Sequence, residues 1–227
     1  MNSSKRKNAL IAGISLILMA VLVGYAYGFV YGSLVFPEQG QKTLDAIQNS
    51  IGTFKFGIAS WIGILILDIL VAWALYLFLK EVQPRLSLVT AAIRILYAGM
   101  LGLAIYHQVA VLSMLDGGGA VSQVMQELKA FENIWSLGLI VFGLHLVGLG
   151  ILCWKAAFVP NFWGGLLIFA GICYSAIHLA KALFPDQINQ IISIEQVLSL
   201  PMAFAEIGLA VWLLWKGGKT PIKTLNA

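Results

Sequence analysis

The stretch FGIASWIGILILDILVAWALYLFL (56–79) contains one charged residue, Asp68, near its middle. A helix needs roughly 20 apolar residues to cross the hydrocarbon core of a bilayer, and this stretch meets that length. Lipid offers no hydrogen-bond partner to backbone N–H and C=O groups, so a chain inside it must be helical or form a closed barrel. Because the stretch lacks the alternating polarity of barrel strands, it predicts a transmembrane helix.

The same pattern recurs along the chain. Its 227 residues are 60% hydrophobic and 11% charged, whereas soluble domains are nearer half apolar and a quarter charged. The stretches long enough to cross a bilayer are 9–36, 56–79, 86–115, 131–154, 158–184 and 197–215. The sequence therefore predicts an all-α membrane protein, a bundle of six transmembrane helices in a single integral-membrane domain over residues 1–227.

The basic residues predict the orientation of this bundle. The larger group falls on the side of both termini: Lys5, Arg6, Lys7, Lys80, Arg85, Lys155, Lys216, Lys219 and Lys223. A smaller group falls on or near the other side: Lys42, Lys55, Lys129 and Lys181. The positive-inside rule then predicts a multi-pass protein of the cell membrane with both termini in the cytoplasm.

Two further expectations follow from this topology. The net charge of +4 is explained by it, so the expected partner is the lipid bilayer and not a nucleic acid. Trp61 and Trp135 lie near the predicted outer ends of their spans, where an aromatic belt at the membrane surface would place them.

The outer connections carry apolar residues at helical spacing. These residues are Leu44, Ile47, Ile51 and Phe54 in the first loop, Val121, Val124, Leu128 and Phe131 in the second, and Ile188, Ile191 and Ile192 in the third. Such spacing predicts short amphipathic helices in the outer loops, lying on the leaflet or covering the bundle.

Four polar side chains fall well inside the predicted spans: Asp68, Arg94, His145 and Glu206. Each costs about 2.5–3.5 kcal/mol at the centre of a membrane helix when it faces lipid. We therefore expect them to face the bundle interior and to meet, with Arg94 as the counter-ion of Asp68, of Glu206 or of both.

The charges of this cluster do not balance, since two carboxylates meet one guanidinium. A proton on a carboxyl group or on His145, or a bound cation, would neutralise the remaining charge. Such a network suits a carrier of a small solute or of protons. It equally suits a structural clamp that fixes the register of the helices, because perturbed charge networks mark functional sites only on average.

A secondary polar seam accompanies the cluster on spans three and five: Tyr97, Gln108, Tyr174 and His178. His107 and His178 have similar predicted depths, so a metal site with two histidines is an alternative interpretation. A lone buried histidine is more often a hydrogen-bonded core residue. We therefore predict no metal and no cofactor.

Gly24, Gly28 and Gly32 follow one another at intervals of four residues. Small residues at this spacing let membrane helices approach closely. The face they form is expected to pack inside the bundle or, alternatively, to join two copies as a homodimer.

The chain lacks the motifs GxxxxGK[ST], HExxH, GxSxG and CxxC, so an enzyme is not the favoured class. Three classes stay open. The first is a small-solute or proton-linked carrier, and the second is a non-catalytic regulator or partner subunit whose ion pairs are structural. The third is a membrane-embedded haem or metal protein.

Five stretches carry a resemblance to a known family: ILILDILVAWALYLFLK (64–80), AAIRILYAG (91–99), VFGLHLVGLGIL (141–152), VPNFWGGLLIFAGICY (159–174) and AEIGLAVWLLWKGG (205–218). Together they resemble the uncharacterised bacterial membrane-protein family filed as domain of unknown function 4386. The resemblance runs from about the first span to Gly217. It implies a multi-spanning membrane protein with Asp68, Arg94, His145 and Glu206 in the family pattern, and it implies no activity.

Overall fold

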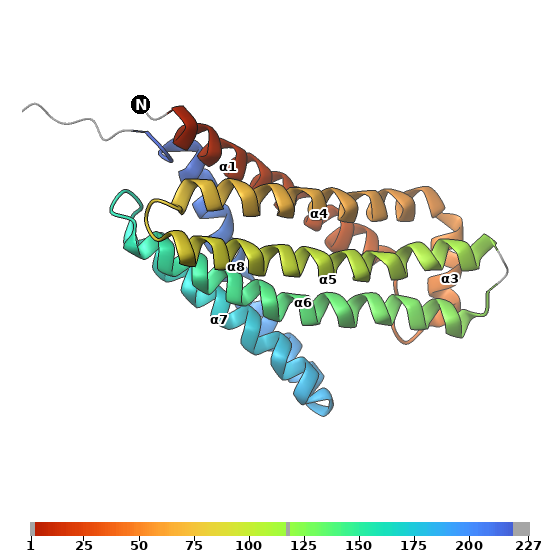
Figure 1. The fold of residues 1–227 in the computed structure, drawn as a ribbon. Helices are drawn as coiled ribbons and strands as arrows, with labels where there is room; N and C mark the ends of the chain where they lie inside the picture. Colours follow the sequence, from red (N-terminus) through yellow and green to blue (C-terminus); the bar gives the residue numbers. More distant parts are fainter. Residues whose placement is uncertain (1–2, 117–118, 220–227) are drawn as a thin grey trace, which may run out of the picture.

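The computed structural model describes residues 3–116 and 119–219. The described chain is built of helices (Figure 1). In order these are α1 (Ser3–Val23), the π-helical segment η1 (Gly24–Tyr31), α2 (Gly32–Leu34), α3 (Gly40–Asn49), α4 (Ile51–Leu79), α5 (Pro84–Asp116), α6 (Val121–Lys155), α7 (Asn161–Leu183), the 3-10 turn η2 (Pro185–Gln187) and α8 (Ile188–Trp215).

Six helical stretches within the described residues are long and apolar enough to cross a membrane, which confirms the predicted fold class. They are Ser4–Leu34, Ile51–Leu79, Pro84–Leu115, Val121–Lys155, Asn161–Leu183 and Pro185–Trp215. The predicted spans 131–154 and 197–215 are shorter than the helices that contain them. Hydropathy marks only the part of a helix that lies in the hydrocarbon core. The helix itself continues beyond that part until a residue ends it.

Two of the three outer amphipathic helices were predicted wrongly as separate elements. The first exists in part as α3, which contains Leu44 and Ile47, whereas Ile51 and Phe54 of the same pattern belong to α4. The second pattern, 121–131, is the beginning of α6, and the third, 188–192, is the beginning of α8. Neither segment contains a glycine or proline that would separate it from the span that follows.

The helices α6 and α7 pack with their backbones unusually close. A methyl group built on Gly150 of α6 would lie 2.7 Å from the carbonyl oxygen of Gly164 on α7. A methyl group on Gly171 of α7 would lie 2.5 Å from the carbonyl oxygen of Gly143. These glycines, seven residues apart on each helix, hold α7 against α6 through close van der Waals packing.

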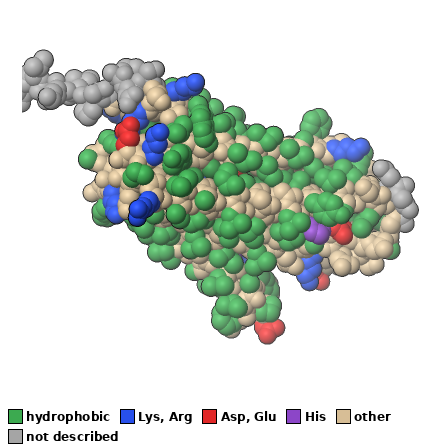
Figure 2. Space-filling view, in the orientation of Figure 1, with side chains coloured by type: hydrophobic (Ala, Val, Ile, Leu, Met, Phe, Trp, Pro, Cys, Tyr) green, Lys and Arg blue, Asp and Glu red, His purple; other side chains and the backbone are tan. Residues whose placement is uncertain are grey.

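Both ends of the described chain lie at the same end of the bundle, here called the termini end. The guanidinium of Arg6 donates to the carbonyl oxygens of Leu213, Leu214 and Gly217, at 3.0, 2.5 and 2.7 Å. It thereby satisfies carbonyl groups that the end of α8 leaves without helical partners. Figure 2 shows Lys and Arg side chains gathered mainly at this end, although Lys223 lies outside the described residues.

The opposite, distal end is less compact. Figure 1 shows the hairpin of α7 and α8 leaning away from α5 and α6, so that its tip stands apart from them. At the termini end α8 packs closely on α1, where a methyl group on Gly13 would lie 2.8 Å from Cγ of Leu214. The helices α1 and α8 therefore meet at one end of the bundle and diverge toward the other.

The face formed by Gly24, Gly28 and Gly32 in the first span was predicted to pack inside the bundle or to join two copies. It does not pack against other helices in the described bundle, so the first of these two predictions was wrong. A methyl group built on Gly24 or Gly28 would meet no described atom within 4 Å, and one on Gly32 would only reach the carbonyl oxygen of Tyr27 at 3.8 Å. The homodimer through this face stays a prediction.

Candidate functional site

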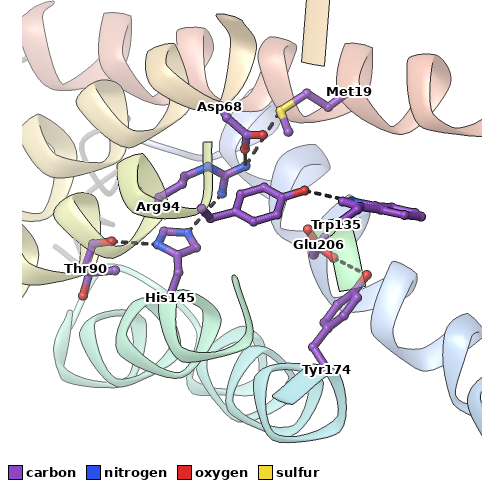
Figure 3. A network of polar contacts seen from close by, with 9 residues as sticks. Met19, Asp68, Thr90, Arg94, Trp135, His145, Tyr174 and Glu206 are labelled. Carbon is purple, nitrogen blue, oxygen red and sulfur yellow. Dashed lines mark hydrogen bonds and ion pairs between the residues drawn. The ribbon is translucent and has the colours of Figure 1, made fainter. Parts of the chain in front are cut away.

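Side chains from four helices meet around the guanidinium of Arg94 on α5 (Figure 3). Its Nη2 lies 2.7 Å from Oδ1 of Asp68 on α4. Its Nη1 lies 3.0 Å from Nε2 of His145 on α6, and Nη2 also lies 3.8 Å from Sδ of Met19 on α1. The structure therefore brings three of the four predicted cluster residues into direct contact.

The two ring nitrogens of His145 have partners that fix its tautomer. A guanidinium only donates hydrogen bonds, so Nε2 accepts from Arg94. The other nitrogen, Nδ1, lies 2.9 Å from the carbonyl oxygen of Thr90, which only accepts, so Nδ1 carries the proton. The imidazole is therefore neutral in this arrangement, and His145 does not supply the positive charge that a second carboxylate would need.

This network is sealed from the surroundings. The exposed fractions of Asp68, Arg94 and His145 are 0, 1 and 1%. A cavity of about 10 Å³ borders His145 and Thr90, which is room for about one water molecule. Two buried atoms of the pair, Oδ2 of Asp68 and Nε of Arg94, have no hydrogen-bond partner among the described residues. The ion pair itself must therefore offset most of the free-energy cost of burying the two charges.

Glu206 stands apart from this network. It accepts a hydrogen bond from the hydroxyl group of Tyr174 at 3.1 Å. The ion pairs among the described residues do not include one between Glu206 and Arg94, or between Glu206 and any other cation. Of the predicted alternatives for Arg94, a pairing with Asp68, with Glu206 or with both, the structure has the pairing with Asp68.

Glu206 lines a cavity of about 570 Å³ in the distal half of the bundle. This volume lies within the range of sites for small organic ligands, roughly 300–1,000 Å³. Six aromatic side chains also line it: Tyr27, Trp61, Tyr97, Trp135, Phe142 and Tyr174. Asp68, Arg94 and His145 do not line this cavity, so one carboxylate of the predicted cluster faces an open space while the other is enclosed.

The residues of the predicted secondary polar seam also do not form one connected group. Tyr97 accepts a hydrogen bond from Nε1 of Trp135 at 3.4 Å, and both side chains line the cavity. The hydroxyl group of Tyr174 donates a hydrogen bond to the carboxylate of Glu206, as described above. Gln108 is buried, but the hydrogen bonds of the described residues do not connect it to Tyr97 or to Arg94.

His178 belongs to a polar group at the distal rim of the cavity. Its Nδ1 lies 2.8 Å from Oγ of Ser136 on α6, and its Nε2 lies 3.6 Å from Oε1 of Glu195 on α8. The other carboxylate oxygen of Glu195 lies 2.6 Å from Nζ of Lys181. Glu195 therefore already has a cationic partner, unlike Glu206.

His107 does not share a partner with His178. Its Nδ1 lies 2.6 Å from Oε2 of Glu127 near the start of α6, at a partly exposed position. No cluster of three or more His, Cys, Asp or Glu side chains suited to a metal occurs within residues 3–116 and 119–219. The structure thus gives the two-histidine site no shared geometry.

Sequence reasoning missed the aromatic wall of the cavity. Trp61 was assigned to a belt at the membrane surface, but it is 1% exposed and its ring packs 5.0 Å from that of Trp135. The ring of Tyr27 also lies 4.7 Å from that of Trp135. Position near a span end is shared by belt residues and by residues that line an inner cavity, so it does not separate them.

Comparison with known proteins connects this chain to one family. The family model described as Domain of unknown function (DUF4386) matches residues 11–217. A protein of Archaeoglobus fulgidus named only as uncharacterised is 30% identical over 156 residues, which cover 69% of this chain and 80% of that protein. No solved structure matches significantly. The chain is a multi-pass membrane protein and belongs to the family Domain of unknown function (DUF4386).

Proposed function

We propose that this protein is a small-solute carrier of the cell membrane whose solute site is the aromatic cavity at Glu206. The cavity carries the proposal: a space of about 570 Å³ inside a six-helix bundle ends at a carboxylate that has no ion-pair partner among the described residues. A group buried only to fix helix register would be enclosed and paired, as Asp68 is.

Two helices that border the cavity depart from regular α-helical hydrogen bonding, which also supports this proposal. The segment η1 of the first span is π-helical and presents Tyr27 to the cavity. The helix α8 contains Pro201, which has no N–H to donate within the helix, between the cavity residues Ser199 and Met202. Irregular segments of membrane helices are frequent at functional sites, the substrate sites of carriers among them.

The proposed orientation places the termini end in the cytoplasm, since the basic residues gather there. It is tested in a chain freed of its two native thiols by Cys153→Ala and Cys173→Ala. A membrane-impermeant thiol reagent added to intact cells is expected to label Lys129→Cys at the distal end and to leave Lys216→Cys unlabelled. The reverse pattern would contradict this orientation.

Transport is tested by access to one cavity position from each side of the membrane. Ala203 lines the cavity three residues before Glu206. In the same thiol-free chain, we expect the polar reagent MTSET to modify Ala203→Cys when applied from the distal side and also when applied from the termini side. A carrier that alternates between two open states exposes its site to both sides, which is the expected outcome.

The matched control is Leu200→Cys on the same helix, whose native side chain is 77% exposed and does not line the cavity. Because a lipid-facing thiol does not ionise, it should resist the reagent from both sides. Modification of Ala203→Cys from one side alone would contradict transport and favour a regulator or partner subunit with a binding site. Resistance of Ala203→Cys from both sides would contradict an open cavity altogether.

A further inference from the structure

One carboxylate on the cavity wall has no ion-pair partner among the described residues. Two carboxylates line the cavity, those of Glu195 and Glu206. Glu195 is paired with Lys181 at 2.6 Å, whereas Glu206 receives only the neutral hydroxyl group of Tyr174. The positive charge of Arg94 is already committed to Asp68 at 2.7 Å. The cavity is therefore complementary to a single positive charge.

The rest of the wall is aromatic and apolar. The ring of Tyr174 lies 5.4 Å from that of Phe142 in an edge-on arrangement, and the ring of Tyr97 lies 5.0 Å from Phe142. These rings line the same space as the carboxylate of Glu206. Aromatic faces attract ammonium-type cations, most strongly where water is excluded.

The ligand chemistry can be narrowed further. A small metal cation needs several oxygen ligands, and the part of the chain that the structure describes offers no cluster of acidic, His or Cys side chains for one. An anion would be repelled by Glu206. A neutral apolar molecule would bury the carboxylate without balancing its charge, which is costly.

We propose that the cavity binds a monovalent organic cation with an apolar body, its charged group against Glu206 and its body among Tyr97, Trp135, Phe142 and Tyr174. This inference rests on the cavity of the proposed function and names the class of solute. Access to the cavity lies on the distal side, where α8 diverges from α1, because the two helices are packed together at the termini end.

The test uses the full chain purified in detergent and the probe tetraphenylphosphonium, a monovalent cation with an apolar body. Equilibrium dialysis is expected to show saturable binding with one site per chain. Glu206→Gln keeps the acceptor for Tyr174 and removes the charge, and we expect it to weaken binding about tenfold or more. The matched control Glu127→Gln changes a carboxylate that pairs with His107 and does not line the cavity, and it is expected to change the affinity less than about threefold.

The neutral probe triphenylphosphine oxide separates charge recognition from apolar burial. We expect it to bind at least about tenfold more weakly than the cation, and to bind Glu206→Gln and the wild type equally. Heat tolerance and size-exclusion behaviour establish that each variant is folded. Equal affinity of the cation for the wild type and for Glu206→Gln, or equal affinity of the wild type for both probes, would overturn the proposal.

This binding result is independent of transport. If Ala203→Cys reacts from both sides and tetraphenylphosphonium does not bind, the carrier stands and the cationic class is wrong. If the cation binds through Glu206 and Ala203→Cys reacts from one side only, the solute class stands and transport is wrong.

Discussion

Asp68 and Glu206 are carboxylates near the middle of their predicted spans, yet the bundle treats them differently. Asp68 is fully buried and pairs with Arg94, which also donates to a neutral His145. Glu206 lines an open cavity and has only Tyr174 as a hydrogen-bond partner among the described residues. The comparison separates two roles that one chemical group can take: a carboxylate closed within its own ion pair holds helices together, and one left facing a space is available to a ligand.

The largest expected effect tests the enclosed network of Asp68, Arg94 and His145, here called the closed region. Arg94→Met leaves the carboxylate of Asp68 uncompensated in the bundle interior, and we expect a loss of about 3–5 kcal/mol in the free energy of unfolding. The double variant Asp68→Leu/Arg94→Met removes both charges and should recover most of this stability. Heat tolerance in detergent, followed by size-exclusion chromatography, measures both. A single variant as tolerant as the wild type would mean that the pair does not hold the bundle.

A smaller effect is expected at the histidine of the same region. His145→Phe removes the acceptor for Nη1 of Arg94 and the donor to the Thr90 carbonyl group, which should cost about 1–3 kcal/mol. His145→Gln offers an amide oxygen and an amide N–H in their place. We expect it to be more heat-tolerant than His145→Phe, and the opposite order would show that ring packing, not hydrogen bonding, is what His145 supplies.

The close packing between α6 and α7 can be tested without changing a charge. Gly150→Ala drives a methyl group toward the Gly164 carbonyl oxygen and should cost about 1–3 kcal/mol. Gly24→Ala adds the same group where it meets nothing within 4 Å, and its heat tolerance should stay near that of the wild type. Equal losses in the two variants would argue against the close approach of α6 and α7.

The smallest effect on stability is expected at Glu206 on the cavity wall, here called the open region. Glu206→Gln changes a partly exposed group and keeps the acceptor for Tyr174, so its free energy of unfolding should stay within about 0.5 kcal/mol of the wild type. Asp68→Asn is the matched change in the closed region and should destabilise strongly, because it leaves Arg94 without its counter-ion. Similar losses in both would remove the distinction between the two carboxylates.

The sequence predicted the fold and an ion pair between Arg94 and a carboxylate of another span, because the cost of charge in lipid leaves few alternatives. It did not predict that Glu206 lies apart. Depth along a span follows from residue number, whereas the distance between two helices depends on how the bundle closes. Trp61 and Trp135 show the same limit, since their heights were predictable and the direction of their rings was not. The joining of the second and third outer helices to their spans was missed because hydropathy marks the membrane boundary and not the helix end.

The most direct test of the account is the reaction of the protein with dicyclohexylcarbodiimide, an apolar reagent that modifies carboxyl groups it can reach within membrane proteins. After digestion and mass spectrometry, we expect modification of Glu206, none of Asp68, and loss of the modified peptide in Glu206→Gln. Modification of Asp68 to the same extent as Glu206, or of Asp68 alone, would contradict the distinction between a closed ion pair and an open acidic cavity.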